Sequence, residues 1–381
     1  MKKGILIAGL LSGIAGTANA QTNITLYGVV DMGLDYTNND GGKSVVKLES
    51  GYAQGSRFGF KGNEDLGGGL SAVFQLENGF NASTGAFGEG GLLFGRQAFV
   101  GLSSKTAGTV TLGRQYDSVI DYVSGLTANG NWAGYLFAHP LDNDNTDYSF
   151  HINNSLKYTS PTIAGFTFGG VYGFGQTAGD STRNSAYSLG ASYANGPLSA
   201  GLAYVNLTSP GSTASGAVTP IDVNFFTGKQ KTFGAGINYA IGATTLGFVY
   251  THTNLTNPTS SEYIGSLAPA VGTLTSLKFN NYEINAKYQF TPAFYAGAMF
   301  TYTQARYATT VGTTKPKWST FGLMADYNFS KRTDVYVQGI YQKVSGDMTG
   351  STLDDAYIPG AGGISDNEKQ VVLRVALRQL F

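Results

Sequence analysis

The stretch Tyr116–Phe150 reads YDSVIDYVSGLTANGNWAGYLFAHPLDNDNTDYSF and shows no regular alternation of apolar and polar residues. It separates two segments that do alternate, residues 108–115 and 152–160. A loop of this length without strands of its own is uncommon in a compact domain and is usually functional. We therefore expect residues 116–150 to fold into the space that the alternating segments enclose, and to narrow it.

The alternating segments continue through the rest of the chain. In residues 23–36, for example, Val30 and Leu34 share one face, whereas Asp31 and Asp35 share the other. A period of two is typical of a strand with one apolar and one polar face. Sixteen such strands are expected, at residues 23–36, 44–61, 70–80, 92–103, 109–115, 152–160, 165–174, 184–194, 198–207, 229–240, 243–251, 277–290, 293–304, 317–329, 333–344 and 369–381.

The connections between these strands alternate in length. Short turns, such as residues 63–69 and 195–197, are followed by longer loops, such as 81–91 and 208–228. Short turns on one rim and long loops on the other are typical of bacterial barrels with an even number of strands. Closure is required because lipid cannot satisfy a free strand edge. The sequence predicts an all-β fold, a 16-stranded antiparallel transmembrane β-barrel with an inward-folded constriction loop.

The composition agrees with this fold class. Glycine accounts for 54 of 381 residues, aromatic residues for 13%, and charged residues for only 13% with no net charge. Disordered chains have the opposite profile, and a balanced charge gives no indication of a nucleic-acid partner. The chain has no cysteine, so disulfides do not hold it together, and no apolar run is long enough for a transmembrane helix.

The first residues have the pattern of a cleaved signal peptide, assigned to residues 1–20. A basic start at Met1–Lys3 precedes a short apolar core, and Ala18-Asn19-Ala20 forms an A-x-A cleavage site. The pattern predicts export, and it leaves residues 21–381 as one barrel domain.

Several motifs resemble those of a known family. They are Leu26-Tyr27-Gly28, Ser56-Arg57-Phe58-Gly59-Phe60-Lys61-Gly62, residues 94–102 (FGRQAFVGL), residues 111–117 (TLGRQYD) and residues 153–158 (NNSLKY). Together they resemble the general, non-specific porins of Gram-negative outer membranes, in their beta-proteobacterial branch. The resemblance implies a homotrimer in outer-membrane lipid and lipopolysaccharide that lets small hydrophilic solutes and ions diffuse passively. It implies neither a cofactor nor an enzymatic activity.

The last residue, Phe381, matches the assembly signal of this family. Counting back by two places Leu377 and Val375 on its face. The resemblance implies that the barrel-assembly machinery recognises this C-terminal strand by strand pairing. Gln379 departs from the aromatic or histidine that is more usual at that position.

Strand parity assigns charged residues to the inside of the barrel. Phe58 and Phe60 are expected to face outward, which turns Arg57 inward. In the strand at 92–103, an outward Phe99 would likewise turn Arg96 inward.

The same argument applies to two further residues. Glu77 falls on the polar face of its strand, and outward Ile152 and Leu156 leave His151 inward. The resemblance implies that Arg57, Arg96 and His151 form a basic ladder on the wall. The family commonly has arginine where His151 stands, so this rung is neutral for much of the time near neutral pH.

The inserted loop supplies acids that would face the ladder. Asp117 and Asp121 lie near its start, with Tyr122 beside them. Opposed rows of cations and anions would create a transverse field that favours polar solutes. These charges could instead be ordinary solvated groups of the lumen.

Arg114 shares the outward parity of Val110 and Leu112. A charge on the lipid face costs about 2–4 kcal/mol at mid-membrane, and a subunit interface would relieve this cost. The resemblance implies a loop that latches onto a neighbouring subunit, so we predict a trimer contact between Arg114 and Glu89 of the 81–91 loop. The alternative is that Arg114 is another rung of the ladder.

Other functions remain open at this stage. A substrate-specific channel for sugars or anions would need a row of aromatic side chains or a dense basic cluster in the lumen. Neither forms a run in the sequence, although Trp132, Tyr135 and Phe137 of the loop are candidates. A barrel enzyme would need a catalytic set, and none is recognisable.

Residues 142–147 (DNDNTD) resemble a calcium-binding run only loosely, and a polar turn that tethers the loop to the wall is the preferred interpretation. The outer loops could also carry an adhesin role.

Overall fold

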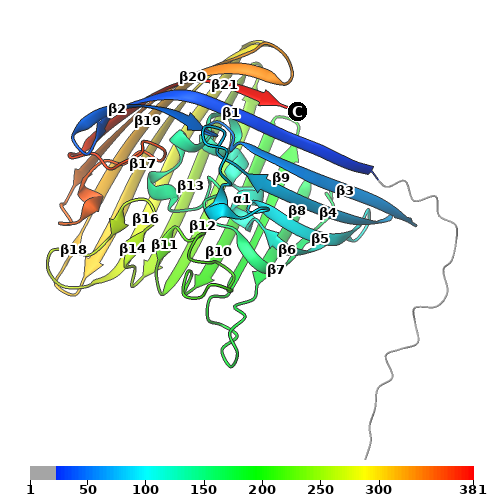
Figure 1. The fold of residues 1–381 in the computed structure, drawn as a ribbon, viewed down its shortest axis with the longest axis horizontal. Helices are drawn as coiled ribbons and strands as arrows, with labels where there is room; N and C mark the ends of the chain where they lie inside the picture. Colours follow the sequence, from blue (N-terminus) through cyan, green and yellow to red (C-terminus); the bar gives the residue numbers. More distant parts are fainter. Residues whose placement is uncertain (1–22) are drawn as a thin grey trace, which may run out of the picture.

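Hydrogen-bonded strands form a closed ring in the computed structural model, which describes residues 23–381 (Figure 1). The main sheet contains eighteen strands. Two of them, β2 and β3, pair with β1 as parts of one spanning strand, and β18 and β19 pair with β17 in the same way. The barrel therefore has sixteen spanning strands, which confirms the predicted fold. The predicted signal peptide, residues 1–20, lies outside the described residues.

Apart from the strand expected at residues 44–61, the strands agree with the predicted ones to within about five residues at either end. The strands are β1 Asn23–Asp40, β2 Lys43–Ser50, β3 Arg57–Gly67, β4 Leu70–Gly79, β5 Gln97–Ser104, β6 Gly108–Gln115, β7 Ile152–Thr159, β8 Phe166–Gly173, β9 Ala186–Asn195, β10 Leu198–Thr208, β11 Phe225–Phe226, β12 Lys229–Ile241, β13 Thr244–Thr256, β14 Ser260–Ser261, β15 Gly265–Ser266, β16 Leu274–Thr291, β17 Phe294–Thr309, β18 Thr313–Thr314, β19 Pro316–Asn328, β20 Thr333–Gly346 and β21 Lys369–Leu380. The helix α1 spans Ser118–Tyr122, and short helical turns follow it at Ser124–Leu126, Asn129–Ala133, Tyr135–Phe137 and Pro140–Asp142, with two more at Glu89–Gly91 and Thr352–Asp354.

The two ends of the sheet meet along β1 and β21. Their antiparallel pairing runs from Val29 opposite Leu380 to Thr37 opposite Val372. Beyond it, the backbone of Phe381 exchanges two hydrogen bonds with that of Gly28, both of 3.0 Å. Because β1 also pairs with β2 and β3, this seam closes the barrel and removes the free edge.

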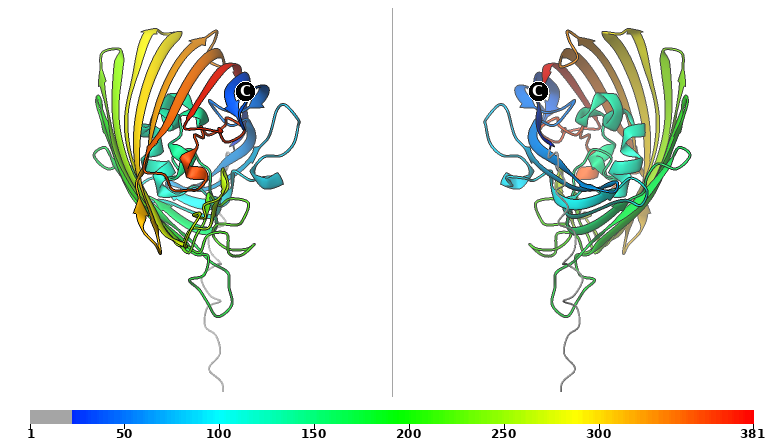
Figure 2. Two further views of the ribbon diagram at one scale, coloured as in Figure 1. Left: turned by 90° about the vertical axis from the view of Figure 1, so that its left-hand side faces the viewer. Right: turned by 90° about the vertical axis from the view of Figure 1, so that its right-hand side faces the viewer.

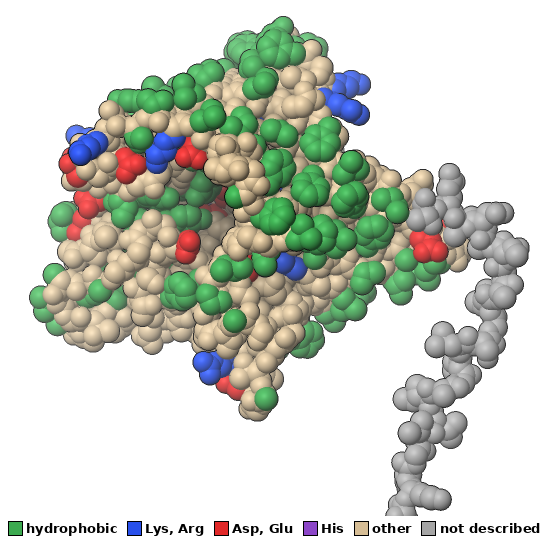
Figure 3. Space-filling model, viewed as in Figure 1, with side chains coloured by type: hydrophobic (Ala, Val, Ile, Leu, Met, Phe, Trp, Pro, Cys, Tyr) green, Lys and Arg blue, Asp and Glu red, His purple; other side chains and the backbone are tan. Residues whose placement is uncertain are grey.

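The wall is apolar outside and polar inside. On β21, Leu373, Val375 and Leu377 point outward and are at least half exposed, whereas Gln370 and Arg374 point inward and are buried. Figure 3 shows hydrophobic side chains spread over the outer wall, with most of the charged side chains in this view near its ends. This alternation is the one expected of a membrane barrel. None of the helices in residues 23–381 has the length and apolar character needed to cross a membrane.

One predicted strand is interrupted. Residues 51–56 leave the wall between β2 and β3, where the sequence predicted a continuous strand over 44–61. Gly51 has a φ of 89°, which suits glycine and turns the chain inward. The carboxylate of Asp31 then accepts a hydrogen bond from the backbone of Gln54 at 2.9 Å. The interruption places Tyr52 inside the barrel.

Residues 116–150 lie inside the ring, as predicted, and Figure 2 shows them in teal with the orange-red segment 347–368 beside them. Two further loops, at residues 209–228 and 258–273, contact these segments. Asn224 donates to the carbonyl of Asp142 at 2.8 Å, and Thr352 donates to the carbonyl of Ser266 at 3.0 Å. Apolar residues of these loops pack against inward side chains of the wall in one buried cluster, which includes Leu141, Phe225, Leu267, Phe279, Trp318 and Leu353. The in-folded loops therefore fill part of the lumen.

Candidate pore constriction

The inner loop (residues 116–150) rests on the wall at positions where the inward residue is glycine. At each of these positions, a Cβ atom would collide with or crowd a side chain of the loop. At Gly297, for example, a Cβ would lie 2.6 Å from the ring of Trp132. The glycines thus leave the recesses that receive the loop. The pairs are Tyr122 with Gly190, Leu126 with Gly236, Trp132 with Gly297 and Phe137 with Gly322.

This packing corrects three predictions about the constriction. Tyr122 is 7% exposed and lies against the wall rather than in the pore. Asp117 is fully buried, and it caps α1: its carboxylate accepts a hydrogen bond from the backbone N–H of Val119 at 2.6 Å. Asp121 forms an ion pair with Lys157 at 2.5 Å and does not line the central cavity.

A polar cavity of about 710 Å³ lies between the inner loop and the wall. Residues 51–55, the strands β3 and β4 and the start of β5 line one side of it, and β16, β17 and β21 contribute residues to the other. The structure brings the predicted residues Arg57, Arg96 and Glu77 together here. Its charged lining residues are Arg57, Glu77, Glu89, Arg96, Asp147, Lys287 and Arg378.

Glu77 is the centre of the charged cluster on the β3–β5 wall. Its carboxylate accepts a hydrogen bond from Nε of Arg96 at 3.0 Å and from the hydroxyl of Tyr27 at 2.8 Å, and it lies 3.7 Å from Nε of Arg57. Gly59 lies opposite Glu77 in the register of β3 and β4, so both point inward with Arg57. The side chain of Arg57 stays 25% exposed and faces the cavity.

Arg96 reaches the cavity for a different reason from the predicted one. It precedes β5, so strand parity does not govern its direction. Phe99, which was expected to face outward, lies opposite the inward Gln75. The outward residues of this strand are Val100 and Leu102, each more than half exposed. The prediction that Phe99 faces outward was therefore wrong, although Arg96 lines the cavity.

The acid of the inner loop that lines the cavity is Asp147, which belongs to the polar run at residues 142–147 and not to the predicted constriction residues. Burial raises the pKa of Asp147 to about 7, while the amide of Asn129, at 3.4 Å, and the charge of Arg96 act in the opposite direction. This carboxyl therefore changes charge near neutral pH. The fold of the loop determines which of its acids faces the pore, so the alternation of residues in the sequence could not identify Asp147 as a lining residue.

His151 does not line the cavity, which corrects a further prediction. It is fully buried beneath Tyr116, with ring centroids 4.9 Å apart, and its Nδ1 lies 3.8 Å from Asp222. Burial and the charges of Arg114 and Arg96 hold the pKa of His151 well below its ordinary value. A neutral His151 cannot act as a rung of the basic ladder.

Arg114 is paired within its own chain. Its guanidinium donates to Asp222 at 2.9 Å, to Asn153 at 2.6 Å and to the carbonyl of Gly95 at 2.5 Å. Glu89 instead lies 3.4 Å from Arg96. The loop at 209–228 thus supplies a carboxylate within the same chain, and Arg114 is buried rather than turned toward lipid. A contact of Arg114 with Glu89 of a neighbouring subunit stays a prediction.

Aromatic side chains surround the same cavity. Tyr52 of the interrupted strand meets Tyr135 of the inner loop edge to face, with centroids 5.6 Å apart. Tyr116 and Tyr148 form a second such pair at 5.2 Å. The aromatic lining residues are Tyr52, Tyr116, Trp132, Tyr135, Tyr148, Tyr263 and Tyr295.

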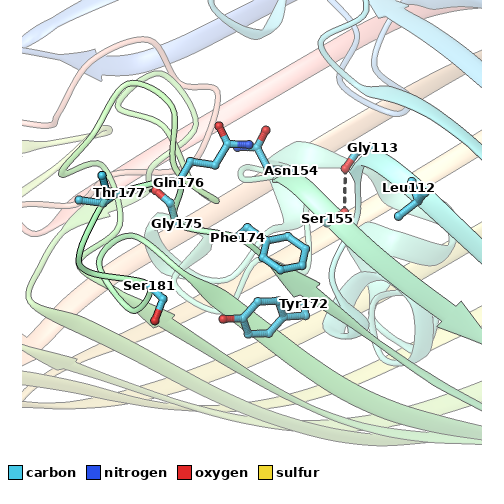
Figure 4. Close-up of a pocket in the computed structure, with 11 residues that line it drawn as sticks. Leu112, Gly113, Asn154, Ser155, Tyr172, Phe174, Gly175, Gln176, Thr177 and Ser181 are labelled. Carbon is cyan, nitrogen blue, oxygen red and sulfur yellow. Dashed lines mark hydrogen bonds between the residues drawn. The ribbon is translucent and has the colours of Figure 1, made fainter. Parts of the chain in front are cut away.

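A larger hollow of about 890 Å³ lies away from this site (Figure 4). It is lined by Leu112, Tyr172 and Phe174, whose exposed side chains belong to the outer face of β6 and the end of β8. Figure 4 shows Gln176, Thr177 and Ser181 of the following loop at its edge. Because it opens outward, this hollow is not part of the passage.

The polar run at residues 142–147 tethers the inner loop to the wall, as the preferred interpretation predicted. Asn143 Oδ1 accepts a hydrogen bond from Asn281 of β16 at 3.0 Å. Within residues 23–381, no group of three or more histidine or acidic side chains is arranged to hold a metal ion.

Comparisons with known proteins agree with this architecture. The profile of a family described as Gram-negative porin matches residues 7–347. An outer membrane porin protein of Bordetella pertussis is 32% identical over 90% of this chain and 94% of its own length. Outer membrane porin protein 32 of Delftia acidovorans is 29% identical over the full length of both chains. Among solved structures, an anion-selective porin from Comamonas acidovorans superposes with a TM-score of 0.70, at 25% identity, over 95% of this chain and all of its own.

Proposed function

Because the chain belongs to the Gram-negative porin family and is an outer-membrane β-barrel, we propose that the cavity of about 710 Å³ is its constriction. Small hydrophilic solutes and ions cross the membrane through it by passive diffusion. The observation that supports this assignment is the position of the cavity, inside the barrel and between the inner loop and the charged β3–β5 wall.

The charges across the constriction create a transverse field. Arg57 and Arg96 stand on one wall, and Asp147 faces them from the inner loop. Rings of charged side chains are an established source of selectivity in pores. Solutes with a dipole or polar groups align in such a field, whereas apolar solutes must displace ordered water.

The reversal potential in a salt gradient tests these roles. Asp147→Asn is expected to shift it toward anions, and Arg57→Ala combined with Arg96→Ala toward cations, because each change removes one side of the field. In the wild type, Asp147 loses its proton as the pH rises through about 7. The cation preference should therefore increase between about pH 6 and about pH 8, and Asp147→Asn should abolish this increase.

Asp121→Asn is the matched control, since Asp121 is paired with Lys157 outside the cavity. An unchanged reversal potential in both cavity variants would remove the proposed field. Absence of any conductance by the purified protein in planar bilayers would remove the channel itself.

We also propose a homotrimer in which the loop at residues 80–96, which contains Glu89, contacts a neighbouring subunit. Phe87 and Leu93 of this loop are each 51% exposed, which is costly for apolar side chains in water. Arg114 contributes indirectly, because it binds the carbonyl of Gly95 at the base of the loop.

Phe87→Glu combined with Leu93→Glu is expected to convert trimers into monomers, because it places charges in the proposed interface. The mass of the detergent-solubilised protein measures this change. A trimer of unchanged thermal stability would show that the loop is not part of the interface. Val271→Glu, at another exposed apolar position in an outer loop, is the control.

The outer wall contacts outer-membrane lipid and lipopolysaccharide in this proposal, and the barrel-assembly machinery recognises the C-terminal strand. Phe381 suits this role, since it directly follows β21 and is 49% exposed.

The aromatic lining of the cavity supports a second candidate, a channel selective for particular ring-shaped solutes such as sugars. Saturable block of the ion current by one solute would distinguish that channel from a general one.

A further inference from the structure

His139 of the inner loop lies fully buried between two carboxylates. Its Nδ1 is 2.6 Å from Oδ2 of Asp144, in the same loop, and its Nε2 is 3.1 Å from Oε2 of Glu283 on β16. None of the three side chains is exposed. The ring therefore connects the inner loop to the barrel wall.

The hydrogen-bond partners of the two carboxylates are consistent with both being ionised. Asp144 also accepts from the hydroxyl of Thr251 and, at 3.3 Å, from the amide of Asn281. Glu283 also accepts from the backbone of Ala128 at 2.8 Å and from the amide of Asn285 at 2.7 Å. Every one of these partners donates a hydrogen, so neither acid needs a proton of its own.

The geometry fixes the protonation of the ring. A neutral imidazole has one N–H and one lone pair, whereas an imidazolium has two N–H groups. Neutral His139 would direct its lone pair at one of the two carboxylates, and only the imidazolium satisfies both. Burial alone would lower the pKa of His139, but the charges and hydrogen bonds of Asp144 and Glu283 raise it to about 10. Among residues 23–381, the charges that raise this pKa are those of Asp144 and Glu283. The carboxylate of the nearby Asp142 accepts hydrogen bonds from the backbone of Asp147 and the hydroxyl of Ser149 instead.

We propose that the imidazolium of His139 is the latch that fixes the pore-lining turn Asp147–Ser149 to β16, and that loss of its proton releases this turn. Asp142 connects the latch to the turn, because its backbone N–H donates to the carbonyl of His139 at 2.8 Å and its carboxylate accepts from the backbone of Asp147 at 3.0 Å. Without the proton, a buried carboxylate faces a lone pair, which is a strongly unfavourable arrangement. His139 is thus a positioning residue for the constriction, and its effect on ion flow rests on the proposed function.

The protonation state is tested without any measurement of conductance. In protein with ¹⁵N-labelled histidine, both ring nitrogens of His139 are expected to carry hydrogens at neutral pH and to lose one near pH 10. His252→Gln supports the assignment of the signals, since His252 lies on β13 and bonds Asn280 at 2.9 Å. A single protonated nitrogen on His139 at neutral pH would overturn the proposal.

Current noise in the open channel tests the latch itself. The raised pKa means that the free energy by which the latch stabilises the loop is complete below about pH 6.5, decreases above it and is lost as the pH rises through about 10, where the ring loses its proton. The wild type should therefore become noisy at alkaline pH, and His139→Gln should be noisy at every pH. Glu283→Gln should move the onset to lower pH, because it removes one of the charges that hold the proton.

A purely structural role for His139 would leave the onset pH unmoved in Glu283→Gln, and that result would overturn the proposal. Quiet currents from His139→Gln over the whole pH range would also overturn it. His252→Gln should behave as the wild type does. If the protein carried no current at all, the proposed function would fail, while the ¹⁵N experiment would still decide the state of His139.

Discussion

Gly297→Val combined with Gly322→Val is expected to raise the single-channel conductance, because each added side chain occupies the recess of a loop residue. Trp132 and Phe137 would be pushed away from β17 and β19, and the inner loop would no longer pack against the wall at these two positions. Overpacking of this kind typically costs about 1–3 kcal/mol per site. That cost falls on the loop rather than on the strands, whose backbone at both glycines has ordinary φ values.

Planar-bilayer recordings measure the single-channel conductance, and two further variants serve as controls. Adding Trp132→Ala and Phe137→Ala should restore the packing of the loop against the wall and lower the conductance again, since the small residues no longer need the recesses. Gly339→Val is the control, because its side chain would meet only Leu373 on the outer face of β20. Wild-type conductance in the double valine variant would contradict the proposed seating of the loop.

Arg374→Met is expected to destabilise the barrel by about 3–5 kcal/mol, the usual cost of removing one partner of a buried charge pair. Arg374 is fully buried on the inside of β21, 3.0 Å from Asp31 and 2.8 Å from Asp35 on β1. It also donates to the hydroxyl of Tyr336 at 2.9 Å and lies over the ring of Tyr52. The substitution leaves two buried carboxylates without their cation, at the seam that closes the barrel.

Denaturant unfolding of the refolded protein measures the loss. Replacing Asp31 and Asp35 by asparagine in the same variant should recover part of the stability, because no uncompensated charge then remains. Lys369→Met is the control, since Lys369 stands on the same strand and pairs with Glu368 at an exposed site. Equal stability of Arg374→Met and wild type would show that the cluster does not hold the seam.

The strands were predictable because lipid imposes a period of two on the residues that face it. The strand expected at residues 198–207, for example, is β10 at Leu198–Thr208. The interruption at residues 51–56 was not predictable in the same way. It depends on contacts of residues 51–56 with Asp31 and with the inner loop. The alternation of apolar and polar residues along one segment gives no information about such contacts.

The candidate site was predicted only in part, for a related reason. Parity identified Arg57 and Glu77 because they stand on regular strands, whereas it misplaced Phe99, an aromatic residue that faces inward. Asp147 and the contact of His139 with Glu283 depend on how the inner loop folds. One signal was nevertheless present, since inward positions of several strands are occupied by glycine. Such a row marks a wall on which another segment rests.

The central claim is that the inner loop narrows the passage from within, and thiol labelling during single-channel recording tests it most directly. The chain has no cysteine, so Asn131→Cys, at an exposed position of the loop on the cavity, provides a single reactive site. Gln176→Cys, at the outer hollow, is the control. We expect a bulky charged thiol reagent to lower the conductance of Asn131→Cys in discrete steps and to leave Gln176→Cys unchanged. A reagent that labels Asn131→Cys fully without altering its current would show that the loop lies outside the passage.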